Sequence, residues 1–121
     1  MAEGSQQIHV VSCDNRADWD KKLEEGKNKL VVAYFSIDWC GPCRFIYPVV
    51  VDLAEKKKDK ATFVKIDVYK LRDITREQRV TAVPTFVLIK NGKEVKRIVG
   101  ARREELQNAV SREAPDPGST S

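Results

Sequence analysis

The feature that most constrains this chain is a change of hydrophobic period on either side of a pair of cysteines. Residues 30–35 form a short apolar run rich in β-branched and aromatic residues, which is typical of a strand buried on both faces. After the cysteines the period changes to that of an amphipathic helix, with apolar residues at Phe45, Ile46, Val49, Val50, Leu53 and Ala54. The sequence therefore predicts a buried strand followed by a helix that begins at Cys40 and Cys43.

Residues 39–43 read Trp-Cys-Gly-Pro-Cys, and this spacing favours reversible disulfide chemistry. Two intervening residues place the cysteines about one helical turn apart, which suits a disulfide. Pro42 fits the first turn because its missing N–H would have no helical acceptor there. A helix N-terminus favours an anion, so we expect Cys40 to attack a substrate disulfide as a thiolate and Cys43 to resolve the mixed disulfide. Because the same sulfurs would oxidise a dithiol in reverse, the spacing predicts thiol–disulfide exchange without fixing its direction.

Other segments have a strand-like pattern. The two-residue turn Asn91-Gly92 is the strongest short signal for a tight β-hairpin. It separates the last two of the strand-like runs, which are residues 8–11, 61–68, 85–90 and 94–99.

Helical patterns lie between these runs. Asn15 with Asp18 three residues later resembles a capping box, and Gly26 is expected to close the helix that follows. The expected helices carry, in chain order, Trp19 and Leu23, then the weaker set Leu71, Ile74 and Val80, and finally Leu106, Ala109 and Val110.

The order β-α-β-α-β-α-β-β-α predicts an α/β fold. The first three strands are candidates for a parallel sheet joined by right-handed crossovers, and the hairpin would add antiparallel strands at one edge. We therefore expect a central mixed sheet of about five strands with helices on both faces and a C-terminal β-hairpin plus helix. This arrangement puts Cys40 at the carboxyl edge of the sheet, where open α/β sheets usually locate their sites.

The length of 121 residues suits one domain. We divide the chain into a flexible N-terminus at residues 1–7, a folded domain at 8–113 and a disordered tail at 114–121, which is rich in Pro, Gly, Ser and Thr. No apolar run has the length of a signal peptide or a membrane span, and an odd cysteine count fits a reducing compartment. We expect a soluble cytoplasmic protein with no membrane association.

The chain resembles the thioredoxin family, most closely its cytosolic eukaryotic, h-like type. The likeness covers about residues 8–114 and is carried by residues 39–43, Pro48, residues 83–85, 91–92 and 99–101. It implies a cis peptide bond between Val83 and Pro84, lying against the cysteines. It also implies an apolar docking surface made by Trp39, Gly41, Pro42, Val83, Pro84, Val99, Gly100 and Ala101. Backbone groups near Pro84 would pair with an extended substrate segment, which predicts a broad range of protein substrates.

The resemblance implies a protein-disulfide reductase that serves electron transport and cell redox homeostasis. Its substrates would be disulfide-containing proteins, peroxiredoxin-like proteins among them. Because the chain has no dinucleotide fingerprint, we expect no bound cofactor, and electrons from NADPH would arrive through thioredoxin reductase. The alternatives are a thioredoxin-like oxidase or isomerase, which Gly41 and Pro42 disfavour, a glutathione-linked variant, and a binding module that works whatever its redox state.

One position departs from the family pattern. Most members carry a buried aspartate six residues before the first cysteine, where it helps to move a proton to or from the second cysteine, and this chain has Tyr34 there. Lys65, which matches the lysine that usually faces this acid, is retained. A phenol, with an unperturbed pKa of about 10, is a poor base near neutral pH. Either water substitutes, or the resolving step is slower, or Tyr34 is simply a core aromatic. Asp38 and Tyr47 are minor departures, at positions expected to tolerate variation.

We expect no further functional site at the third cysteine, at the possible zinc ligands or at the basic clusters. Cys13 is expected to be a small buried residue in a monomer, with a Cys13-linked dimer or glutathionylation of Cys13 as the alternatives. His9, Cys13, Cys40 and Cys43 have the residue types of a Cys₃His zinc site. A single Cys-x-x-Cys motif with Gly-Pro inside is a weak metal signal, so we expect no metal. The lysines of residues 56–60 and the Arg102-Arg103 pair lack interleaved aromatic residues, and we expect no nucleic-acid binding.

Overall fold

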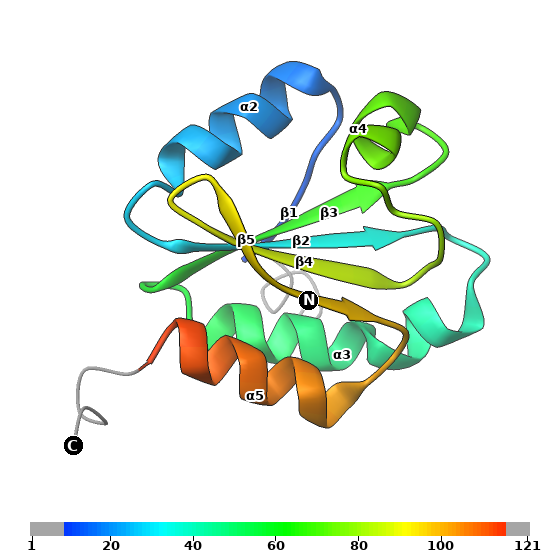
Figure 1. Ribbon diagram of the computed structural model, residues 1–121. Coiled ribbons are helices and arrows are strands. Elements are labelled where there is room, and N and C mark those ends of the chain that lie inside the picture. Colours follow the sequence, from blue (N-terminus) through cyan, green and yellow to red (C-terminus); the bar gives the residue numbers. More distant parts are fainter. Residues whose placement is uncertain (1–8, 116–121) are drawn as a thin grey trace, which may run out of the picture.

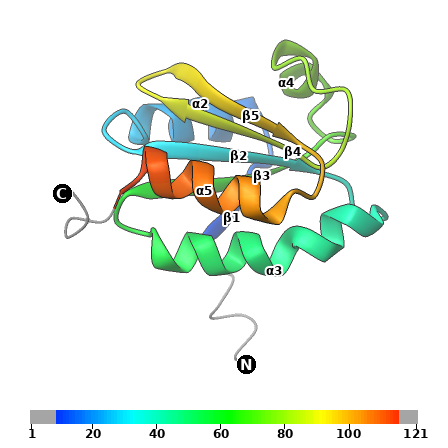
Figure 2. The ribbon, with the colours of Figure 1, turned by 60° about the horizontal axis from the view of Figure 1, so that its bottom comes forward.

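The computed structural model describes residues 9–115, and they form a five-stranded mixed sheet covered by helices on both faces. Figure 1 shows α2 and α4 on one face and α3 and α5 on the other, and Figure 2 shows the same layers from below. The elements are β1 (Val10–Ser12), α2 (Arg16–Glu25), β2 (Leu30–Ser36), α3 (Gly41–Lys56), β3 (Ala61–Asp67), α4 (Arg72–Glu77), β4 (Thr85–Lys90), β5 (Lys93–Val99) and α5 (Arg103–Glu113). The expected fold class and element order are confirmed.

The strands run in the order β1-β3-β2-β4-β5 across the sheet. β3 pairs in parallel with both β1 and β2, whereas β4 pairs antiparallel with β2 and with β5. The sheet is therefore parallel on one side and a hairpin on the other, as expected. The hairpin turn has Asn91 at φ +52° and Gly92 at φ +78°, which are the left-handed conformations that this turn requires.

The central strand β2 is buried along its whole length. Alternate side chains of a strand point to opposite faces, so its residues divide between two cores. Leu30, Val32 and Tyr34 pack with α3 and α5, and Val31, Ala33 and Phe35 pack in the core that contains Trp19 of α2 and Ile74 of α4. The continuous apolar run in the sequence reflects burial on both faces.

The predicted start and end of α2 are confirmed by its capping hydrogen bonds. The Asn15 side chain accepts a hydrogen bond from the Asp18 N–H (2.8 Å), and the Asp18 carboxylate accepts one from the Asp14 N–H (2.9 Å). The Gly26 N–H donates to the Lys22 carbonyl oxygen at the end of α2 (3.0 Å).

Several expected boundaries need correction. The helix expected around Leu71, Ile74 and Val80 is only Arg72–Glu77, and Val80 lies after it, although its side chain is buried. Phe45, which the helical pattern placed on the apolar face of α3, is 68% exposed.

The expected N-terminal segment at residues 1–7 lies outside the described residues, as do residues 116–121 of the expected tail. At Ala114 the prediction of a disordered tail is wrong, because this side chain is 3% exposed and packs in the core with α5. Among residues 9–115, no helix has both the length and the apolar composition needed to cross a membrane.

Candidate functional site: the Cys40–Cys43 disulfide and its surroundings

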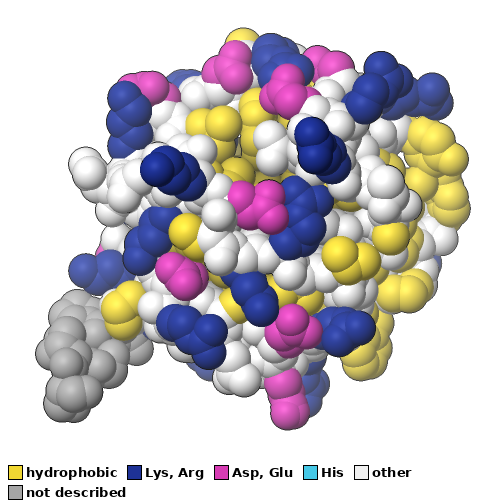
Figure 3. All heavy atoms as spheres, viewed as in Figure 1, with side chains coloured by type: hydrophobic (Ala, Val, Ile, Leu, Met, Phe, Trp, Pro, Cys, Tyr) yellow, Lys and Arg dark blue, Asp and Glu magenta, His cyan; other side chains and the backbone are white. Residues whose placement is uncertain are grey.

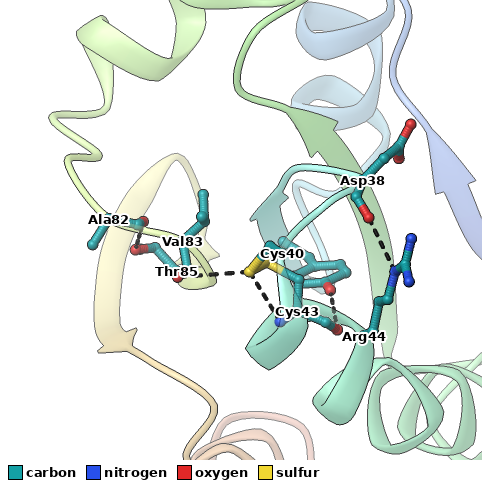
Figure 4. The surroundings of a disulfide bond; sticks show 8 residues. Asp38, Cys40, Cys43, Arg44, Ala82, Val83 and Thr85 are labelled. Atoms are coloured by element: carbon teal, nitrogen blue, oxygen red, sulfur yellow. Dashed lines mark hydrogen bonds between the residues drawn. A yellow bond between two sulfur atoms is a disulfide. The ribbon is translucent and has the colours of Figure 1, made fainter.

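The two cysteines form a disulfide at the point where β2 passes into α3, with their Cα atoms 5.2 Å apart. Cys40 is the N-cap of α3, and its Sγ accepts a hydrogen bond from the Cys43 N–H (3.1 Å; Figure 4). A sulfur in this place is aligned with the free N–H groups and the positive end of the helix. The predicted placement of both cysteines is confirmed.

The two cysteines differ in accessibility. Cys43, in the first turn of α3, is 3% exposed, whereas Cys40 is partly exposed and its neighbour Trp39 is 69% exposed. A disulfide of another protein can therefore approach Cys40 from solvent but cannot approach Cys43 in the same way.

A loop before β4 lies directly against the disulfide. The Val83–Pro84 peptide bond is cis, as the resemblance implied, and the Val83 carbonyl oxygen lies 4.0 Å from Cys40 Sγ (Figure 4). The Thr85 hydroxyl donates to the Ala82 carbonyl oxygen (2.7 Å), which closes the loop. The Val83 N–H and carbonyl group form no backbone hydrogen bond within residues 9–115, so both remain available for an incoming peptide.

The segment between β5 and α5 lies beside this loop. The Gly100 N–H donates to the Pro84 carbonyl oxygen (2.8 Å), and Val99 pairs with Thr85 in the sheet. Gly100 has φ +101°, a conformation that a residue with a Cβ rarely adopts.

The structure therefore brings the expected docking residues to one end of the sheet. Trp39 and Val99 are 69% and 48% exposed, and the remaining residues are exposed or half-buried except for Pro84, which is buried. In the space-filling view, hydrophobic side chains gather along the edge of the molecule where α3 begins (Figure 3).

Two exposed aromatic residues enlarge this apolar area beyond the expected set. They are Phe45, at the start of α3, and Tyr69, which is 50% exposed in the loop after β3. A stricter helical period would have placed Phe45 at the edge of the face formed by Ile46, Val50 and Leu53. Tyr69 lies in a loop and therefore gives no periodic signal. The loop is held by hydrogen bonds from the Tyr69 and Lys70 N–H groups to the Asp67 carboxylate (2.8 and 3.1 Å).

Tyr34, at the position of the family's acid, is a buried structural residue. Its hydroxyl donates a hydrogen bond to the Cys43 carbonyl oxygen (2.8 Å), and its ring stacks on Phe86 with centroids 5.0 Å apart. Burial raises the pKa of Tyr34 to about 12, and the nearby Ser36 hydroxyl opposes this shift only partly. The phenol therefore stays protonated near neutral pH and cannot accept a proton from Cys43.

Lys65 has an aromatic partner. Its Nζ lies 5.3 Å from the centroid of the Tyr47 ring, and that ring in turn stacks on Tyr34 with centroids 6.2 Å apart. A cation over an aromatic face is attracted by the ring's quadrupole. Tyr47, which we interpreted from the sequence as a minor departure from the family pattern, thus contacts both Tyr34 and Lys65.

An open pocket of about 520 Å³ reaches Cys43 from the side, and its lining includes Tyr34, Ser36, Tyr47 and Lys65. The Ser36 hydroxyl, buried at 2% exposure, has no well-formed hydrogen bond within the described part of the chain. An open pocket with buried polar groups can admit water to the neighbourhood of the second cysteine.

A groove of about 310 Å³ extends from Val83 along α4, and its lining includes Tyr69 and Arg72. The Tyr69 ring stacks on Trp39 with centroids 5.1 Å apart, and the Arg72 guanidinium carbon lies 5.5 Å from the Tyr69 centroid. The sequence did not single out Tyr69 or Arg72.

The other candidate residues do not join the site. Cys13 is a free cysteine, 6% exposed, and burial raises the pKa of its thiol. His9 Nε2 lies 3.4 Å from a Glu55 carboxylate oxygen. Within residues 9–115, no three His, Cys, Asp or Glu side chains gather as a metal site, so the nominal zinc set does not assemble.

Comparison with known proteins agrees with this geometry. The family model described as Thioredoxin matches residues 10–112. Thioredoxin H-type 1 of Nicotiana tabacum is 44% identical over 115 residues, which cover 93% of this chain and 90% of that protein. Thioredoxin H2-2 of Oryza sativa subsp. japonica is 50% identical over 105 residues, covering 84% of this chain and 78% of that protein.

A crystal structure of the thioredoxin NaTrxh from Nicotiana alata superposes with a TM-score of 0.82 at 40% identity, covering 88% of this chain and 93% of that chain. Fold, cysteine pair and cis-proline loop thus coincide with a family match along almost the whole chain. The chain belongs to the thioredoxin family, is similar to its H-type members, and is a dithiol–disulfide reductase of the thioredoxin type.

Proposed function

We propose that Cys40 is the attacking sulfur and Cys43 the resolving sulfur in the reduction of disulfide-containing proteins. The single observation that carries this assignment is the difference in burial, since Cys40 is partly exposed beside the Val83 loop and Cys43 is 3% exposed. The Cys40 thiolate attacks one substrate sulfur, the substrate S–S bond breaks, and the other substrate sulfur leaves and takes up a proton. The Cys43 thiolate then attacks Cys40 Sγ, releases the second substrate thiol and closes the Cys40–Cys43 disulfide.

The substrate docks in this proposal on the apolar surface around the disulfide. Trp39, Gly41, Pro42, Val83, Pro84 and the segment 99–101 supply that surface, with Phe45 and Tyr69 at its margin. The N–H and carbonyl group of Val83, which form no backbone hydrogen bond within residues 9–115, pair with the backbone of an extended substrate segment. This mode of binding uses main-chain groups, so it suits many protein substrates, including peroxiredoxin-like ones.

Proton transfer at Cys43 proceeds through water in the open pocket beneath α3. Tyr34 cannot serve as a base because its hydroxyl is committed to the Cys43 carbonyl oxygen and its pKa is about 12. Lys65, held over Tyr47, supplies a positive charge to the same pocket. Cys43 therefore exchanges its proton with water in this pocket rather than with Tyr34; Asp38 also lines the pocket.

Reducing equivalents come from NADPH through thioredoxin reductase, and the protein itself holds no cofactor. The disulfide at an open surface supports this route, because a partner protein can reach Cys40 directly. We place the protein in the cytoplasm, as a monomer, since a single exchanging pair with a buried free Cys13 suits a reducing compartment.

The test is NADPH consumption with insulin as the substrate and thioredoxin reductase as the electron donor. The expected result is steady turnover by the unmodified protein and none by the Cys40→Ser/Cys43→Ser variant. Cys40→Ser alone should form no mixed disulfide with substrate, whereas Cys43→Ser should accumulate one.

An inactive protein whose disulfide is reduced readily by glutathione would contradict the thioredoxin reductase route and favour the glutathione-linked alternative. An inactive protein whose serine double variant keeps its cellular role would favour the binding module. Net oxidation of a dithiol substrate under the same conditions would favour the oxidase.

A further inference from the structure

The groove beside the cis-proline loop leads away from the reactive sulfur and contains one charged residue. It starts at Val83, whose carbonyl oxygen lies 4.0 Å from Cys40 Sγ, and it reaches Arg72 and Thr75 on α4. All its other lining residues are apolar or carry a hydroxyl group. A peptide whose cysteine reacts at Cys40 can therefore continue into a groove in which Arg72 is the only charged residue among the described residues that line it.

Arg72 has no carboxylate partner among residues 9–115. The two acids of its own helix, Asp73 and Glu77, are both bound by Arg16 of α2, each at 3.0 Å. Arg76 lies one helical turn after Arg72, is exposed, and also lacks an ion pair in the described part of the chain. Like charges four residues apart repel each other on a helix, so a carboxylate bound between them would relieve an existing repulsion.

The Arg72 side chain is held in place by an aromatic row. Its guanidinium carbon lies 5.5 Å from the centroid of Tyr69, and Tyr69 stacks on Trp39, the neighbour of Cys40. Trp39 and Tyr69 are 69% and 50% exposed, so the row is accessible to a docking protein. A guanidinium already placed by a ring loses less conformational freedom when it pairs with a carboxylate.

We propose that the groove selects substrate segments that carry a carboxylate within a few residues of the reactive cysteine. Arg72 pairs with that carboxylate, Arg76 adds to the attraction, and apolar substrate side chains fill the groove between Val80 and Val83. The inference rests on the proposed function, because it takes attack by Cys40 as the reaction that the groove assists. This pairing changes the rate at which a substrate is captured, and it leaves the thiol–disulfide exchange between the substrate, Cys40 and Cys43 unchanged.

The experiment uses two synthetic peptides, each closed by one intramolecular disulfide. They are identical except that three positions flanking one cysteine are Glu in the first peptide and Gln in the second. The fully reduced protein is mixed with each peptide, and the second-order rate constant of reduction is divided by the rate constant with dithiothreitol. This ratio removes the intrinsic effect of the Glu side chains on the peptide disulfide.

We expect the ratio to be about five- to tenfold higher for the Glu peptide at low ionic strength, and the preference to shrink as salt is added. Arg72→Gln should abolish most of the preference, and Arg72→Glu should reverse it. Arg112→Glu is the matched control and should preserve it, because Arg112 lies in the last turn of α5, whose C-terminal end is opposite the start of α3 (Figures 1 and 2).

The outcomes separate this inference from the proposed function. A protein that reduces insulin but reduces both peptides equally, or reduces neither, contradicts the carboxylate preference alone. An equal loss of the preference in Arg72→Glu and Arg112→Glu would also overturn it, because the effect would then come from net charge. A protein that reduces neither insulin nor the peptides contradicts the proposed function and the inference with it.

Discussion

The Tyr34 hydroxyl donates a 2.8 Å hydrogen bond to the carbonyl oxygen of Cys43, which joins the central strand β2 to the backbone of α3. The Tyr34 ring also stacks on Phe86 and on Tyr47, and Tyr47 lies beside the Lys65 ammonium group. These contacts make Tyr34 part of the support beneath the first turn of α3. The position where most of the family carries an acid is here a packing position.

Tyr34→Phe should destabilise the protein modestly. The substitution keeps the ring and its stacking but removes one buried hydrogen bond, which costs about 1 kcal/mol of unfolding free energy. Urea denaturation at pH 7 measures the difference. A loss above about 3 kcal/mol would mean that the hydroxyl supports more than the Cys43 carbonyl group.

The same pair of proteins should show a stability crossover at alkaline pH. The pKa of Tyr34 rises from 10.0 to about 12 on folding, so the folded state holds the phenolic proton more tightly. This contribution is complete below pH 10 and is lost as the pH rises through 12. Two pKa units correspond to about 2 to 3 kcal/mol, so Tyr34→Phe should become the more stable protein near pH 12.

Urea midpoints at several pH values between 8 and 12 test this crossover. Tyr47 is present in both proteins, so its titration cancels in the comparison apart from its charge interaction with Tyr34, which itself contributes to the raised pKa of Tyr34. A constant difference across the whole range would show that Tyr34 does not titrate with a raised pKa.

Tyr34→Asp should accelerate the resolving step while lowering stability. A carboxylate near Cys43 can act as a base, which we expect to raise the rate of substrate release from the Cys40 mixed disulfide by at least about tenfold at pH 7. Loss of the buried ring should cost about 3 kcal/mol or more. Stopped-flow release of a substrate thiol from the preformed mixed disulfide measures the rate.

Tyr34→Asn is the matched control for that variant, because it creates a similar cavity without a base. Equal release rates for the Asp and Asn variants would show that the carboxylate brings no proton-transfer advantage at this position.

Val83→Asp should impair substrate capture without unfolding the protein. The residue is half-buried beside Cys40, and a carboxylate there would be placed between the sulfur and an incoming chain. We expect the kcat/KM for insulin to fall at least about tenfold, with kcat less affected. Val95→Asp, on an exposed position of β5, is the control and should leave kcat/KM unchanged.

Cys13 should remain a thiol in the folded protein. Its side chain is 6% exposed and burial raises the pKa of the thiol, so both access and thiolate content are low. After treatment with mild oxidant, size-exclusion chromatography should show a monomer, and a thiol reagent should modify Cys13 only in denaturant. A dimer that disappears in Cys13→Ser would contradict this expectation.

The local structure around the site could be predicted from the sequence. The change of hydrophobic period around residues 39–43 predicted that a helix begins at the two cysteines, because buried residues recur at different intervals in strands and in helices. The Asn91-Gly92 turn and the Asn15 cap were also predictable, because the local backbone conformation at these positions depends on the residues themselves. The cis bond before Pro84 followed only from the family resemblance, as X-Pro bonds are mostly trans.

Tertiary packing decided the rest. Tyr34 meets Cys43, and Tyr47 meets Lys65, only because α3 lies across β2 and β3, so neither partner could be inferred from sequence spacing. Exposure of Phe45, burial of Ala114 and the row from Trp39 through Tyr69 to Arg72 depend likewise on which elements are neighbours. The reactive pair and its reaction class followed from the amino-acid sequence, because they depend on short-range spacing. The surroundings of that pair were decided by contacts between residues distant in the chain.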